Sequence, residues 1–448
     1  MSDRLEQLAS DLLAQARKAG ADAADAIAVD GTSISIDVLN GRLEHAERSE
    51  GVDIGLRVLI GQRQACVSAS DIKPETLATM AARAVAMARE APADDTLGLA
   101  DPDQLAREWD LAALDLADPA AEPDPATLEA LACRAEAAAL GVEGVSQVQS
   151  ASAGYGRRAI HVAASNGFSG GYARTDTALS CVAITGSGSG MERDYDGETR
   201  IYAADMPDPE TIGRRAGERT VARNGARRPR TGAYPVIYDE RISTGLIGHL
   251  LQAANGAAVA RGASWLRGAL GTQVLPEGLS IIEDPRRPRC AGSRPFDAEG
   301  LPTTRRAIVE DGVLCGWTLD LATARKLGMR STANAARGTS GPPAPVTGNI
   351  SLTQGTLSRE AMMREIGTGL LVTSMLGSSI NPNTGDYSRG ASGFWIENGE
   401  IAYPVNEITL AGSLPQMLRS IVPANDARPH LSRRVPSLLV EGLTLAGD

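Results

Sequence analysis

The stretch FWIENGEIAY, residues 394–403, places an Asn-Gly dipeptide between two short apolar runs. Asn-Gly favours the positive φ angles of a type I′ turn, so this pattern predicts a β-hairpin. The stretch AIVEDGVLC, residues 307–315, repeats the pattern around an Asp-Gly dipeptide. Residues 331–355 and 376–393 are rich in Gly, Ser, Thr, Asn and Pro, and we expect them to be long loops that cover a site. The second half of the chain is therefore predicted to be β-rich.

The first half of the sequence combines helical and strand-like patterns. Apolar runs at Ala26–Val29 and Ile34–Val38 are followed by Asp30-Gly31 and Asn40-Gly41, which predicts a meander of antiparallel strands. Four stretches are expected to be helical: 3–19, 74–91, 126–140 and 209–224. We therefore predict an α+β fold. Its antiparallel sheet, covered by helices on one face, belongs to residues 1–228, and a β-rich domain with long loops follows in residues 229–448.

Composition and charge exclude several classes of protein. At 448 residues the chain is long enough for two domains of ordinary size. Its net charge of −11 argues against binding to the phosphate backbone of a nucleic acid. The basic cluster RNGARRPR, residues 223–230, is interpreted as a solvated linker. The start of the chain does not resemble a signal peptide and no apolar run reaches 18 residues, so we expect a cytoplasmic protein without a membrane span.

No familiar metal-binding motif occurs in the sequence. The five cysteines are scattered without a C-x-x-C pair, so neither a disulfide framework nor a zinc ribbon is expected. H-E-x-x-H and the P-loop are also absent, and GSGSG at residues 186–190 has the wrong order for G-x-S-x-G, in which serine holds the central position. A serine and a histidine brought together from distant segments remain an open alternative. No local metal-ligand pair is formed by the four histidines, His45, His161, His249 and His430.

Three stretches carry a family resemblance. They are YPVIYDERISTGLIGHLLQAANGAAVAR at 234–261, SMLGSSINPNTGDYSRGASGFWIENGEIAYPVNEITLAGSLPQML at 374–418, and GMERDY at 190–195. Together they resemble the TldD/PmbA peptidase family, and within it the PmbA (TldE) branch. The resemblance extends over essentially the whole chain, including its helix-then-strands opening.

This resemblance also implies where a metal site has been lost. In the TldD branch, a helix carries H-E-x-x-x-H, whose two histidines and a later cysteine bind the metal while the glutamate serves as base. The first histidine falls here on Gly248, the glutamate on His249 and the second histidine on Ala253, and no cysteine follows Ile421. Glycine and alanine offer no ligand atoms. We therefore expect no catalytic or metal-binding residue in this chain and a packed, non-catalytic His249. The sequence assigns no substrate-binding residue.

The resemblance implies a supporting subunit of a TldD/TldE-type metallopeptidase. Zinc is then expected in a TldD-type paralogue that forms a heterodimer with this chain. Such complexes degrade unfolded or leader peptides and take part in the maturation of peptide antibiotics. Two other classes remain open: a homodimeric protein-binding module of the gyrase-modulator type with no hydrolytic role, and a peptidase with a nucleophile from a distant segment.

Overall fold

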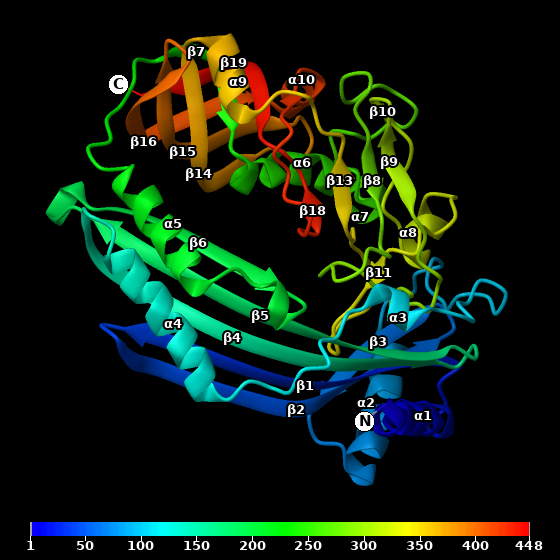
Figure 1. Cartoon of the computed structure of the whole chain (residues 1–448). Coiled ribbons are helices and arrows are strands. Elements are labelled where there is room, and N and C mark those ends of the chain that lie inside the picture. The colour runs from blue at the N-terminus through cyan, green and yellow to red at the C-terminus, as the bar shows by residue number, and fades with distance from the viewer. Residues whose placement is uncertain (1, 448) are drawn as a thin grey trace.

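The computed structural model describes residues 2–447. Figure 1 shows a long curved sheet flanked by helices and, across from it, a β-rich part. The first, here the N-terminal part, contains α1 (Ser2–Ala19), β1 (Ala23–Leu39), β2 (Arg42–Ile60), β3 (Arg63–Ala69), α2 (Pro74–Glu90), α3 (Leu111–Leu114), α4 (Pro125–Leu140), β4 (Val145–Ala164), β5 (Ser169–Thr185), β6 (Glu192–Arg200) and α5 (Pro209–Val221). The division at residue 228 stays a prediction.

The second, here the C-terminal part, begins at Gly232. It contains β7 (Gly232–Tyr238), α6 (Glu240–Ala253), α7 (Gly256–Ala260), β8 (Ile281–Glu283), β9 (Arg306–Glu310), β10 (Val313–Leu314), α8 (Leu321–Lys326), β11 (Ala335–Ala336), β12 (Ala344–Pro345), β13 (Ile350–Leu352), α9 (Arg359–Ile366), β14 (Gly369–Ile380), β15 (Asp386–Glu397), β16 (Glu400–Ser413), α10 (Leu414–Arg419), β17 (Val422–Pro423), β18 (Arg433–Arg434) and β19 (Leu438–Ala446). Among the helices formed by residues 2–447, none is long and apolar enough to cross a bilayer.

One six-stranded antiparallel sheet, in the order β3-β2-β1-β4-β5-β6, forms the base of the N-terminal part. Side chains alternate between the two faces of a strand. Accordingly, Ala24, Ala26 and Ala28 of β1 share a core with α1 and α2, and Ile34 and Ile36 share a core with α4 and α5. All five lie on one face of the sheet. The predicted antiparallel sheet covered by helices on one face is therefore confirmed.

The strands of this sheet are longer than the sequence predicts. The predicted turn at Asp30-Gly31 is wrong, because β1 continues through it and pairs with β2 on one side and β4 on the other. Gly31 lies opposite Gly51 and has no positive φ. Pairing on both edges thus overrides the turn preference of an Asp-Gly dipeptide. The turn at Asn40-Gly41 is confirmed, with φ angles of 56° and 68°.

The C-terminal part contains a closed barrel. Strands β16, β15, β14, β7 and β19 are neighbours in that order, and β16 also pairs with β19. A second sheet has the order β10-β9-β8-β13-β18. Both predicted hairpins are confirmed: Asp311-Gly312 joins β9 to β10, and Asn398-Gly399 joins β15 to β16, all four residues having positive φ.

The two predicted loops differ in outcome. Residues 331–355 are mostly irregular and include three short strands, β11 to β13. The loop predicted at 376–393 is wrong, because β14 extends to Ile380 and β15 begins at Asp386. Small residues are needed here for close packing of backbones. A Cβ on Gly393 would lie 1.9 Å from the carbonyl oxygen of Leu371, so its glycine reflects strand contact and not loop flexibility.

The basic segment 223–230 connects the two parts and is exposed over most of its length, as interpreted from the sequence, but Arg223 and Arg227 contact the C-terminal part. Arg223 is only 8% exposed, and its Nη2 donates to Oγ of Ser392 at 2.5 Å. The guanidinium of Arg227 lies 3.8 Å from the ring centroid of Tyr403. Arg223 is therefore held by burial and hydrogen bonding, and the exposed Arg227 by a cation–π contact.

A buried ionic cluster joins the two parts at the other end of the sheet. Asp25 of β1 lies opposite Arg57 of β2, and the guanidinium of Arg57 is 2.5 Å from its carboxylate. Arg337, from the loop between β11 and β12, contacts the same carboxylate, and its side chain has no exposed surface. We refer to Asp25, Arg57 and Arg337 as the Asp25 clasp. Buried charges of this kind are tolerated because they are paired.

The loop that carries Arg337 approaches β2 so closely that Gly55 should not tolerate a side chain. A Cβ there would lie 2.2 Å from the carbonyl oxygen of Thr339, and backbone cannot rotate away. We expect Gly55→Ala to lower the free energy of unfolding by about 1–3 kcal/mol in urea titrations, as overpacking usually does. Gly51→Ala, where a Cβ meets nothing within 4 Å, is the control on the same strand. Equal stability of the two variants would contradict the close approach.

Candidate functional site

Helix α6 carries the three positions at which the resemblance locates the family's metal site. The helix begins after Asp239, whose side chain caps the first turn by accepting the N–H of Arg241 at 3.1 Å. Its apolar face packs into the core of the C-terminal part. The rest of the helix borders two cavities. Arg241 and Thr244 line a cleft between the two parts, whereas His249, Gln252 and Ala253 line a smaller cavity of about 350 Å³.

Gly248 and Ala253 provide no atom that could bind a metal ion. A Cβ on Gly248 would lie 3.5 Å from Nη1 of Arg433, so a guanidinium cation lies beside this position. Within residues 2–447, no group of three or more His, Cys, Asp or Glu side chains is arranged to hold a metal ion. The residues present on α6 therefore do not fit the metal site of the TldD branch.

His249 packs as an uncharged ring. Its ring centroid lies 6.0 Å from that of Tyr387 in an edge-to-face arrangement, and its buried Nε2 has no hydrogen-bond partner among the described residues. Burial, with a smaller effect from Arg389, lowers the pKa of His249 to about 4. The imidazole is therefore neutral at pH 7 and packs against an aromatic ring. Whether it has any catalytic duty stays a prediction.

One serine–histidine contact is present among residues 2–447, but no third residue completes it as a catalytic triad. Nε2 of His161 lies 2.9 Å from Oγ of Ser169 across the β4–β5 hairpin. Nδ1 of His161 is buried and has no partner in the described chain, so no carboxylate orients the ring. Burial lowers the pKa of His161. A triad needs such an orienting group, so this pair does not form one.

The cleft between the two parts has a volume of about 560 Å³ and a strongly basic lining. Several of its arginines are neutralised by carboxylates and form its walls. Arg428 joins Glu198 of β6 to Glu240 of α6, at 3.3 and 2.9 Å. Arg241 reaches Asp194 of β6 at 3.0 Å. These contacts attach the edge strand of the N-terminal sheet to the first turn of α6.

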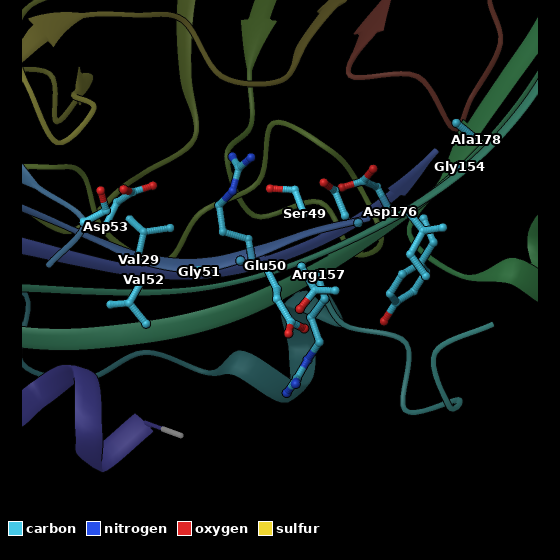
Figure 2. A pocket seen from close by; sticks show the side chains of 18 residues that line it. Val29, Ser49, Glu50, Gly51, Val52, Asp53, Gly154, Arg157, Asp176 and Ala178 are labelled. Carbon is cyan, nitrogen blue, oxygen red and sulfur yellow. The ribbon is translucent and has the colours of Figure 1, made fainter. Parts of the chain in front are cut away.

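A shallow trough of about 680 Å³ runs across the middle of the N-terminal sheet. Figure 2 shows Ser49, Asp53 and Asp176 on the side of the sheet that faces the C-terminal part, and Glu50 and Arg157 on the opposite side. Glycine and serine on β1, β2 and β4 make the floor of the trough flat. A flat floor of exposed backbone can accept an extended chain.

The trough and the cleft are continuous, because Arg158 and Asp176 line both. Neither was found by reasoning from the sequence, which assigned no substrate-binding residue. The lining residues are scattered between β1 and β18, and no spacing along the chain relates them. The register of β4 with β5 could have paired Arg158 with Arg174, but only after the strands had been given their full length.

The chain matches three models of one family: PmbA/TldA metallopeptidase domain 1 at residues 24–88, the central domain at 118–224 and the C-terminal domain at 231–447. It is 37% identical to metalloprotease PmbA of Escherichia coli O157:H7, over 93% of this chain and 90% of that protein. It is 35% identical to the metalloprotease PmbA homolog of Haemophilus influenzae, over 99% of this chain and 96% of that one.

Solved structures show the same architecture. A candidate modulator of DNA gyrase from Bacteroides thetaiotaomicron superposes with a TM-score of 0.91 and 28% identity, over 100% of this chain and 99% of the other. TldE from Thermococcus kodakarensis superposes with a TM-score of 0.85 over 98% of this chain and 100% of that chain. At 21% identity, the second likeness shows the fold alone.

Proposed function

Because this chain belongs to the PmbA/TldD metallopeptidase family, we propose that it is the non-metallated subunit of a TldD/TldE-type metallopeptidase. In this proposal the zinc ion and the catalytic residues belong to a TldD-type paralogue that forms a heterodimer with this chain. The substrates are unfolded or leader peptides, including precursors of peptide antibiotics.

The proposal is supported above all by the residues of α6 at the family's metal-site positions. Gly248 and Ala253 lack ligand atoms, and the neutral His249 packs against Tyr387. A family member with these residues can assist hydrolysis only by binding, orienting and enclosing the peptide. Such positioning is a large part of catalysis, because a peptide bond must be held in line with the group that attacks it. The continuous trough and cleft supply a surface for that task, and the net charge of −11 favours a peptide partner over a nucleic acid.

A second candidate is a homodimeric protein-binding module with no hydrolytic role. It is favoured by the description of the solved structure from B. thetaiotaomicron as a candidate modulator of DNA gyrase. The two candidates differ in what this chain needs. The peptidase subunit acts only with a metal-bearing paralogue, whereas the binding module acts as a dimer of twice 46.6 kDa without one.

Co-expression with a TldD-type paralogue that carries H-E-x-x-x-H tests the peptidase role. We expect a mixed complex that cleaves unstructured peptides, while this chain alone cleaves none and contains well under one zinc per chain by elemental analysis. His249→Ala in this chain should lower the turnover of the complex by less than about tenfold, since removing a true general base costs about 10²–10⁴-fold. The matched control is replacement of the paralogue's motif glutamate by glutamine, which should abolish hydrolysis.

Two results would overturn the proposal. One is the absence of any mixed complex in light scattering, with this chain remaining a homodimer. The other is stoichiometric zinc and peptide hydrolysis by this chain alone, both lost on chelation.

A further inference from the structure

Two arginines face each other across neighbouring strands at the junction of trough and cleft. Arg158 of β4 and Arg174 of β5 are register partners, and both line the cleft. Directly opposite residues on one face of a sheet have Cβ atoms about 4.5–5.5 Å apart, and like charges there are destabilising. A chain with net charge −11 thus places two cations together where a neutral pair would be more stable.

Among residues 2–447, no carboxylate forms an ion pair with either arginine. Arg174 donates through Nη2 to the carbonyl oxygen of Ala291, which carries no charge. Arg158 is exposed, and within residues 2–447 no hydrogen bond or ion pair engages its guanidinium. Asp176, which also lines the cleft, lies opposite Gly156 and is not ion-paired with either arginine among the described residues. The pair therefore presents free positive charge to the cleft.

A third cation faces the pair from the C-terminal part. Arg433 of β18 lines the same cleft, is exposed, and has no carboxylate partner among residues 2–447. The absence of a side chain at Gly248 leaves room for its guanidinium beside α6. Arginine presents its donors in a planar fork that matches a carboxylate. Three guanidinium groups of this kind line one cavity, so the cavity is suited to bind an anionic group.

The shape and lining of the cavity favour a peptide over a nucleic acid. Sites for single-stranded nucleic acids combine basic side chains with aromatic rings on which bases stack. The described residues that line the cleft include no Phe, Tyr or Trp. A volume of about 560 Å³ suits a few residues of peptide, and the flat trough that continues from it can hold the rest of an extended chain.

We propose that Arg158, Arg174 and Arg433 bind a carboxylate of an extended peptide whose backbone continues along the trough. This inference rests on the proposed function, because that function makes the ligand a peptide. It adds that the peptide is selected by negative charge, either at its C-terminus or on an Asp or Glu side chain. The pair of opposed arginines is then retained because the ligand neutralises it.

Binding of fluorescent ten-residue unstructured peptides to the full chain, measured by anisotropy, tests this site. One peptide has a free C-terminus and neutral side chains, a second is amidated with acidic side chains, and a third is amidated and neutral. We expect the first or the second to bind at least about tenfold more tightly than the third, and Arg158→Gln and Arg174→Gln each to remove about tenfold of that preference. Whichever peptide binds identifies the carboxylate.

Arg193→Gln is the control, because Arg193 of β6 is an exposed arginine that lines neither the cleft nor the trough. It should leave peptide affinity unchanged. Arg158→Gln should keep or raise the melting temperature, since it relieves a like-charge contact, so lost binding cannot be ascribed to unfolding. Equal binding of all three peptides, or displacement of the acidic peptide by an oligothymidylate of equal length at equal concentration, would overturn the proposal.

The outcomes for this site and for the peptidase role are separable. If the mixed complex forms and cleaves peptides without preference for acidic ones, only the arginine site is wrong. If no mixed complex forms but this chain alone binds acidic peptides through Arg158 and Arg174, only the role as a peptidase subunit is wrong.

Discussion

Replacing Asp25 by asparagine should lower the free energy of unfolding by about 3–5 kcal/mol, the usual cost of breaking a buried ion pair by removing one partner. Asp25 is the carboxylate of the clasp, and the side chains of Arg57 and Arg337 are 5% and 0% exposed. Asparagine keeps the shape but leaves two guanidinium ions buried next to each other. Urea unfolding followed by circular dichroism measures the loss.

Comparing the losses in the free energy of unfolding among variants of the Asp25 clasp tests this explanation. Arg337→Ala leaves a neutral pair of Asp25 and Arg57, so it should cost less than Asp25→Asn. In the double variant the two effects should be less than additive, because both act on one cluster. Asp30→Asn, on the same strand and without an ion pair among the described residues, should change stability by less than about 0.5 kcal/mol. A cost for Asp25→Asn no larger than that of Asp30→Asn would show that the clasp adds nothing.

The stabilisation that Glu299 contributes should fall as the pH rises from about 5 to about 8. Burial, with a further effect of Asp297, raises the pKa of Glu299 to about 8, well above its ordinary value of 4.5. The folded chain therefore holds a proton that the unfolded chain releases. This stabilisation is fully present below about pH 4.5 and is lost as the pH rises through about 8.

Melting temperatures at pH 5.5 and pH 8.5 test the role of Glu299. Glu299→Gln should reduce the difference between the two pH values relative to the unmodified chain, because glutamine cannot lose a proton. Comparing the two proteins removes the effects of all other titrating groups. The exposed Glu310→Gln serves as the control. An unchanged pH dependence in Glu299→Gln would assign the titration to a different group.

The sequence predicted correctly those turns that join two strands adjacent in the chain. Asn398-Gly399 and Asp311-Gly312 form turns as expected, since each follows a strand whose partner comes next in the chain. Asp30-Gly31 does not, because β4, which comes more than a hundred residues later, extends the ladder past it. The dipeptides are similar, and what separates them is a distant partner that local pattern cannot reveal.

Contacts between residues that are distant in the sequence also determine the burial of Arg223 and the lining of the cleft, so neither could be predicted from local patterns. Arg223 reads as part of a solvated basic run, yet it is buried against Ser392. Arg158 and Arg174 have no relation along the sequence and meet only through the register of β4 with β5. The missing ligand atoms at Gly248 and Ala253, by contrast, follow from residue identity, because no fold can supply a donor atom that the side chain lacks.

The barrel has a consequence for the order in which the chain can fold during synthesis. Strand β7 lies between β14 and β19, so both of its neighbours emerge from the ribosome long after it does. The N-terminal sheet has all of its strands once Arg200 has been made. Translation interrupted before residue 438 should therefore yield a finished sheet attached to a barrel with open edges. Unpaired edges invite association with other chains, so such nascent products should depend on chaperones until the last barrel strand is in place.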